Sequence, residues 1–180
     1  MRRAYYYTLA SLPSLFFASP LPLTIKDFFS QCRFELTSKD FAILQSAQLS
    51  PSDYAPLPFL KKWYSRERQI RNELVRLRAR KLGWDAGRYR RKGEEDGERA
   101  VKFARDIFSM DSPGTAEKRL DQERWNYLSE MESNHYFDLE KLISYALKLK
   151  INEKILGLDP QKGWEKQEAI LARLPDHINL

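Results

Sequence analysis

The chain has 180 residues, 42% of them hydrophobic and 13% aromatic, which is enough to bury a core without disulfides or a structural metal. Its single cysteine, Cys32, excludes an intramolecular disulfide, and we interpret it as a small buried side chain. The net charge is +6, and residues 61–110 hold 16 of the 31 Lys and Arg residues but only 8 of the 25 Asp and Glu residues. Such a basic region predicts a phosphate, an acidic protein or an anionic membrane as partner, and charge alone does not choose among them.

The first 23 residues are apolar and contain three prolines. The run Tyr5-Tyr6-Tyr7 and Pro13 are unsuited to the apolar helix of a signal peptide, so we expect no cleaved signal. No stretch holds 18 continuous apolar residues, which predicts that the chain has no membrane-spanning helix. We interpret residues 4–23 as a short strand or helical turn followed by an extended segment packed on the body.

Two short helices are predicted next. Thr24 and Asp27 have the spacing of a capping box, so a helix is expected to begin at Thr24. A second helix is expected to begin at Thr37 or Ser38 and to run through Leu44. Residues 47–58, which contain three prolines, are predicted to form a connector.

The strongest helical pattern runs from Pro58 to Leu82 and ends at Gly83, a residue typical of helix C-termini. Glu67 interrupts its apolar seam and stands four residues before Arg71, a spacing that supports a helix. The period fits a helical hairpin or a coiled-coil-like arm. The apolar seam consists of Leu60, Trp63, Ile70, Leu74 and Leu77.

Residues 83–97 contain four of the seven glycines and the run Arg88-Tyr89-Arg90-Arg91-Lys92, followed by three acidic residues. This Gly-rich loop is the best candidate for a domain boundary. We therefore expect an N-terminal helical lobe over 1–82, the loop over 83–97 and a C-terminal helical lobe over 98–180, with one continuous domain as the alternative.

Four more helices are predicted after the loop. An amphipathic face lies between Ala100 and Phe108, and Ser112-Pro113 is a cap followed by proline at the first helical position. A helix from about Asp138 is expected to be the most buried, and Asp159-Pro160 repeats the cap-then-proline signal. No alternating strand pattern is present, so the predicted fold is an all-α bundle of five to seven helices around a long central helix.

The sequence contains no Gly-rich phosphate loop, no Cys-x-x-Cys and no His-Glu-x-x-His. The segment from Glu132 to His135 matches the Glu-x-x-His element of di-iron bundles, which require two such elements and two further glutamates. The second histidine, His177, has no such context, so we interpret His135 as a surface or helix-end histidine.

Four carboxylates of the same region admit a catalytic interpretation as acid and base pairs. On an amphipathic helix such acids normally form the solvated face, and that is the interpretation we favour. We therefore expect no enzymatic activity, no cofactor, no metal and no bound nucleotide. The four carboxylates are Asp121, Glu123, Glu130 and Glu132.

Four stretches add a family resemblance: Tyr5 to Pro13, Arg71 to Gly83, Leu120 to Leu128 and His135 to Leu149. In order and spacing they resemble an uncharacterised bacterial family whose genes accompany V/A-type ATP synthase genes. That family is similar, more distantly, to the helical funnel of these machines, the part that sits on the membrane rotor ring and receives the foot of the central stalk. The funnel is built from three similar helical lobes, and the resemblance implies a shortened version of that lobe arrangement.

The resemblance also implies a non-catalytic subunit or accessory protein that couples or docks the central stalk to the rotor ring. Its implied partners are the central-stalk and rotor-ring subunits, and its implied location is the cytoplasm, at the inner face of the membrane. We expect Arg88, Arg90, Arg91 and Lys92 to bind the partner, and we expect no small-molecule substrate. Two alternatives stay open: a basic nucleic-acid-binding protein in which Tyr89 stacks on a base, and a helical scaffold of unknown partner.

Overall fold

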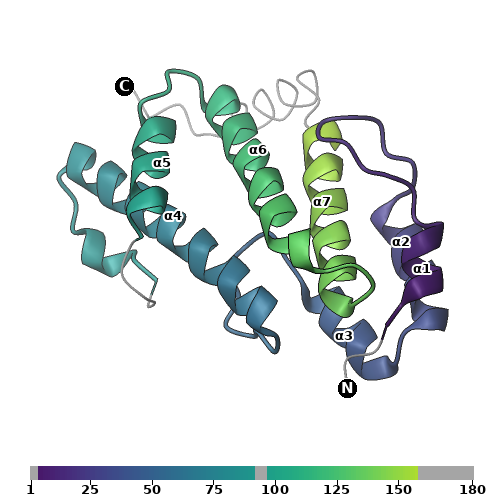
Figure 1. Ribbon diagram of the computed structural model, residues 1–180. Helices are drawn as coiled ribbons and strands as arrows, with labels where there is room; N and C mark the ends of the chain where they lie inside the picture. The colour runs from purple at the N-terminus through teal and green to yellow at the C-terminus, as the bar shows by residue number, and fades with distance from the viewer. Residues whose placement is uncertain (1–3, 92–96, 158–180) are drawn as a thin grey trace, which may run out of the picture.

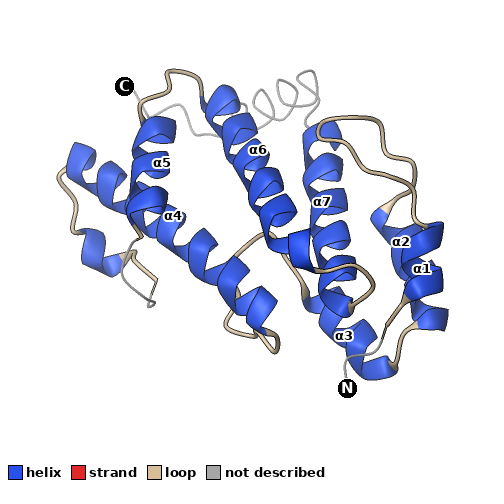
Figure 2. Cartoon of the chain, viewed as in Figure 1, coloured by secondary structure: helices blue, strands red, loops and turns tan. Residues whose placement is uncertain are grey.

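The computed structural model describes residues 4–91 and 97–157, and within these ranges every regular element is helical (Figure 2). The prediction of an all-α fold is confirmed. No helix of the described residues is long and apolar enough to cross a membrane. The elements are α1 (Tyr6–Ser11), α2 (Ile25–Glu35), α3 (Ser38–Ser46), α4 (Pro58–Leu82), α5 (Glu98–Phe108), α6 (Pro113–Met131) and α7 (Leu139–Gly157), with short 3₁₀ turns η1 (Ala86–Arg88) and η2 (Glu132–Asn134).

Local sequence signals set most of the helix ends. Thr24 and Asp27 form the predicted capping box at the start of α2, and the side chain of Thr37 caps α3. Ser112 caps α6 ahead of a proline in the first turn. Gly83 ends α4 with a φ of 68°, in the left-handed region that glycine adopts without strain. The predicted helix beginning near Asp159 lies outside the described residues.

The segment between α1 and α2 is extended and packs on α7, as predicted. The side chain of Asn152 accepts a hydrogen bond from the Ala18 N–H at 3.0 Å and donates one to the Phe16 carbonyl oxygen at 2.8 Å. The hydroxyl of Tyr145 donates to the Pro13 carbonyl oxygen at 2.9 Å. Side chains of α7 therefore satisfy backbone groups that no regular structure pairs.

The larger hydrophobic core surrounds α7, which lies between α6 on one side and α1 and α2 on the other (Figure 1). Its apolar side chains have the spacing predicted from the sequence, and Leu142, Ile143 and Ala146 are fully buried. Cys32 is fully buried in the same core, and burial raises the pKa of its thiol to about 12. This cysteine is therefore a packing residue, as predicted.

A second, smaller core lies where α5 crosses the C-terminal half of α4 (Figure 1). It contains Ile70 and Leu74 of α4, side chains of α5, and Leu120 of α6. Because α4 and α6 contribute to both cores, each core contains residues from both sides of 83–97. The division into lobes over 1–82 and 98–180 stays a prediction.

Candidate docking surface and buried ion cluster

Exposed cations gather at the C-terminal end of α4 and on the segment that follows it. The segment 84–91 folds back beside α4 through η1, which brings the sequence-predicted arginines next to cations of the last helical turn (Figure 1). Asp85, the one acidic residue of this segment, accepts a hydrogen bond from the Gly87 N–H at 2.8 Å. We call this surface the basic tip; it consists of Arg80, Lys81, Arg88, Arg90 and Arg91, all exposed.

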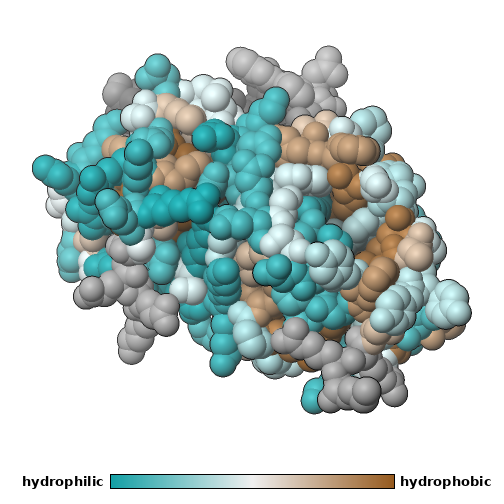
Figure 3. Space-filling view, in the orientation of Figure 1, coloured by the Kyte–Doolittle hydropathy of each residue, from teal (hydrophilic) through white to brown (hydrophobic). Residues whose placement is uncertain are grey.

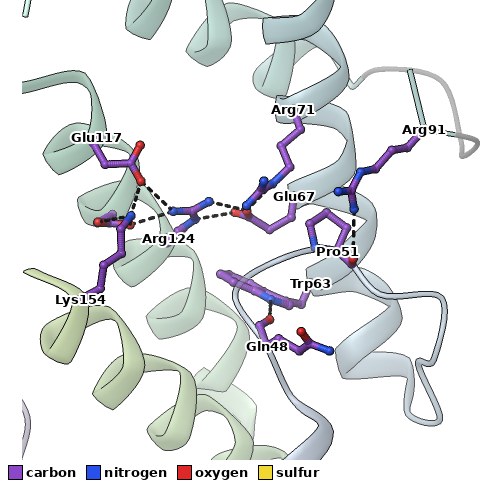
Figure 4. Close-up of polar contacts among 10 residues, drawn as sticks. Gln48, Pro51, Trp63, Glu67, Arg71, Arg91, Glu117, Arg124 and Lys154 are labelled. Carbon is purple, nitrogen blue, oxygen red and sulfur yellow. Dashed lines mark hydrogen bonds and ion pairs between the residues drawn. The ribbon is translucent and has the colours of Figure 1, made fainter. Parts of the chain in front are cut away.

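The basic tip is tied to α4 through the buried side chain of Asn72. Its amide nitrogen donates to the Arg91 carbonyl oxygen at 2.9 Å, and its amide oxygen accepts from the Arg91 N–H at 2.9 Å. The Arg91 guanidinium also donates to the Pro51 carbonyl oxygen at 3.2 Å (Figure 4). Arg91 is thus partly a structural residue, whereas Arg88 projects from the tip. Lys92, the fourth predicted contact, lies outside the described residues.

Two aromatic rings lie among these cations. Trp84 is 60% exposed and Tyr89 is 57% exposed, and their ring centroids are 6.3 Å apart. Exposed aromatic side chains of this size are unusual outside binding surfaces. The wider face over α4 and α5 is covered mainly by hydrophilic side chains, and hydrophobic ones gather toward α1 and α2 (Figure 3).

Beneath the tip, a cluster of buried charges joins α4, α6 and α7 (Figure 4). Arg124 is only 5% exposed and donates from Nε and a terminal nitrogen to both oxygens of Glu67, at 3.0 and 2.8 Å. Its other terminal nitrogen donates to Asp121 at 2.8 Å. Lys154 of α7 pairs with Asp121 at 2.9 Å and with Glu117. We call these five residues the buried ion cluster.

The cluster corrects the interpretation of Asp121 as part of a solvated helix face. Its side chain is fully buried, because Arg124 and Lys154 supply the positive charge that a buried carboxylate needs. Burial lowers the pKa of Arg124, but its contacts with Glu67 and Asp121 outweigh this and raise it above its ordinary value. The guanidinium therefore stays charged, and the cluster holds three helices together.

Glu132 is also paired rather than solvated. Its carboxylate accepts hydrogen bonds from Lys148 at 2.6 Å and from the Ser144 hydroxyl at 2.5 Å, and Lys141 lies 3.3 Å away. The interpretation of Glu123 as solvated is also wrong, since it pairs with Arg66 and is largely buried. Glu130 is exposed, as predicted.

The Glu-x-x-His segment does not bring its two ends together. Glu132 faces α7, whereas His135 contacts the Asp138 carboxylate through Nδ1 at 2.6 Å and packs edge-on against Phe59. His135, Asp138 and Glu140 offer ligand atoms within 4.8 Å of one another, and in residues 4–91 and 97–157 they form the one such group. The second pair of ligand elements that a di-iron bundle needs is therefore missing from this part of the chain.

Comparison with known proteins finds one family in the C-terminal part of the chain. Residues 100–178 match the family described as protein of unknown function (DUF2764). No curated protein and no solved structure matches the chain. The DUF2764 match covers α6, α7 and most of α5, including four residues of the buried ion cluster, whereas Glu67 and the basic tip precede it.

The sequence does not reveal the pairing that links the DUF2764 region to α4. Glu67 interrupts the apolar seam, and a carboxylate at a core position predicts a buried cation nearby. Nothing in the sequence says that this cation is Arg124, 57 residues further on. Asn72 escapes sequence reasoning for the same reason, because its partner is a backbone group of Arg91.

Proposed function

We propose that the protein is a non-catalytic subunit or accessory protein of a bacterial V/A-type ATP synthase that docks the central stalk to the membrane rotor ring. The basic tip is the contact surface in this proposal. The observation that carries it is a group of five exposed cations held at the end of a helix of 25 residues, which is about 38 Å long. Such a surface suits an acidic protein partner.

The sequence resemblance to the family found beside V/A-type ATP synthase genes supports the choice of this machine. A coupling part must transmit torque, so it needs helices that do not move relative to one another. The buried ion cluster fixes α4 to α6 and α7, and both hydrophobic cores contain side chains of α4. The helix that carries the basic tip is therefore anchored along most of its length.

The buried carboxylates support a non-catalytic role. Glu67 is paired with Arg124, Asp121 with Arg124 and Lys154, and Glu132 with Lys148. A general acid or base must reach a proton of its substrate, whereas these carboxylates are already engaged by cations of the chain itself. The location that follows from this proposal is the cytoplasmic face of the membrane, with no membrane-spanning part in the contact.

The test is capture of central-stalk and rotor-ring subunits by the tagged protein. The contact variant replaces Arg88, Arg90 and Lys92 with Gln and keeps Arg91, because Arg91 holds the segment on α4. The control variant replaces the exposed Lys26, Arg33 and Lys39, which lie on α2 and α3, with Gln and removes the same charge.

We expect the contact variant to lose association more than the control variant, with the larger difference at low salt, where screening is weakest. If the wild-type protein captures neither the stalk nor the ring, the proposal is wrong. If the two variants bind equally well, the basic tip is not the contact.

A second candidate function is binding of single-stranded nucleic acid. The observation that favours it is the pair of exposed rings, Trp84 and Tyr89, beside arginines that can neutralise phosphates. Retention on a single-stranded oligonucleotide that is lost on replacing both rings with Ala, together with failure to capture ATPase subunits, would favour this function over the first.

A further inference from the structure

A pocket of about 360 Å³ lies between α4, α6 and the segment that carries Tyr89. Ligand pockets for small molecules begin at about 300 Å³, so its size is that of a binding site. One wall is a single face of α4, with Arg71 and Arg78 seven residues apart and apolar side chains between them. The opposite wall contains Glu117 and Arg124 of α6.

The pocket has more cations than it has partners for them. Arg124 is offset by Glu67 and Asp121, and Glu117 is paired with Lys154. Arg78 is exposed and makes no hydrogen bond or ion pair with the described residues. The Nε of Arg71 is buried and makes no hydrogen bond, and the nearest carboxylate oxygen to it, on Glu67, is 3.7 Å away.

The surroundings of Arg71 point the same way (Figure 4). Burial lowers the pKa of this guanidinium, Glu67 raises it, and the positive charges of Arg124 and Arg91 lower it again, with a net lowering. An anion between Arg71 and Arg78 would relieve the repulsion and would accept hydrogen bonds from donors that have none.

We propose that this pocket binds the linked phosphate groups of a small molecule that contains a diphosphate. Arg71 and Arg78 are about 10 Å apart along the helix axis, so two linked phosphates reach both better than one phosphate or one carboxylate does. Each guanidinium offers a planar fork that matches phosphate oxygens in a bidentate manner. The exposed ring of Tyr89 forms the side of the pocket and would lie against whatever group the diphosphate carries. This proposal is independent of the proposed docking function.

The experiment is isothermal titration of the full chain with inorganic pyrophosphate and, separately, with ADP, at constant ionic strength set with sodium chloride. The pocket variant is Arg78→Gln, which removes an exposed side chain and leaves the buried ion cluster intact. The matched control is Arg80→Gln, an exposed arginine of the same helix that does not line the pocket.

We expect saturable binding to the wild type, and a Kd raised about ten-fold or more in Arg78→Gln, since hydrogen bonds between charged groups are among the strongest in proteins. Arg80→Gln should bind as the wild type does. If ADP binds more tightly than pyrophosphate and Tyr89→Ala removes only that difference, the ligand is a nucleotide. Equal affinities identify the diphosphate alone as the ligand.

Two results would overturn the proposal. One is the absence of saturable binding of both pyrophosphate and ADP to the wild type. The other is an equal loss in Arg78→Gln and Arg80→Gln, which would mean that anions collect on the basic surface without using the pocket.

Discussion

Arg124 has two carboxylates within hydrogen-bond distance in a place that water hardly reaches. Its contacts with Glu67 and Asp121 offset a desolvation cost that is large for all three groups. Such a cluster adds little net stability compared with a well-packed apolar replacement, but the loss of one member leaves another charge buried and unpaired. The value of the cluster lies in holding one relative position of α4 and α6.

We predict that Arg124→Met lowers the free energy of unfolding by about 3–5 kcal/mol, because Glu67 is left buried without its bidentate partner. The double variant Glu67→Leu/Arg124→Met should lose less than Arg124→Met alone, since it removes both charges. Urea unfolding followed by circular dichroism measures both. Lys118→Met, an exposed change on the same helix, serves as control and should have little effect. A double variant that is less stable than the single one would contradict this account.

The pKa of Glu132 predicts how stability responds to acid. Burial would raise this pKa, but hydrogen bonds from Lys148 and Ser144 and the charges of Lys148 and Lys141 lower it below its ordinary value. A carboxyl whose pKa is lower in the folded state stabilises that state above its unfolded pKa. This contribution is lost as pH falls through the folded pKa.

We therefore expect the free energy of unfolding to fall between about pH 5 and pH 3, and to fall less in Glu132→Gln than in the wild type. Urea midpoints measured across this range test the prediction. Glu35→Gln, an exposed change on α2, is the matched control and should keep the wild-type slope. If Glu132→Gln has that slope too, the Lys148 pair does not contribute to the acid response.

The helix α4 shows which features of an element are local. Its start at Pro58, its end at Gly83 and its apolar seam are all predictable from neighbouring residues, because caps and periodicity act within a few positions. The candidate site could not be predicted in this way. The Glu67–Arg124 pair and the Asn72–Arg91 bonds join residues 57 and 19 positions apart, and only the folded chain brings them together.

Gly83 provides a test of the local part. We predict that Gly83→Ala destabilises the protein by about 1–2 kcal/mol, because alanine is strained in the left-handed conformation with a φ of 68°. An added Cβ would meet no atom within 4 Å, so the cost is one of backbone conformation alone. Thermal unfolding measures it. Gly157→Ala, also free of contacts but within the last turn of α7, should be neutral or stabilising. Equal losses in both variants would show that the backbone conformation at position 83 is not the cause.

At the scale of the whole molecule, the two hydrophobic cores are connected rather than separate. Long helices α4 and α6 belong to both, and the buried ion cluster lies where the cores adjoin. A sequence boundary at 83–97 reflects glycine content and charge, which report on local chain conformation and not on which helices share a core. The helices themselves were predictable, while their assignment to two connected cores depends on contacts between distant residues.

This connection predicts one cooperative unfolding transition. Leu142→Ala opens a cavity in the larger core and Ile107→Ala in the smaller one, and each should destabilise the protein by about 2–5 kcal/mol. Because α4 and α6 cannot leave one core without disturbing the other, both variants should lower the temperature of the same single transition. Scanning calorimetry measures the number of transitions, and circular dichroism recorded in parallel should give the same midpoint. Two transitions, each shifted by only one of the variants, would show instead that residues on the two sides of 83–97 unfold as separate domains.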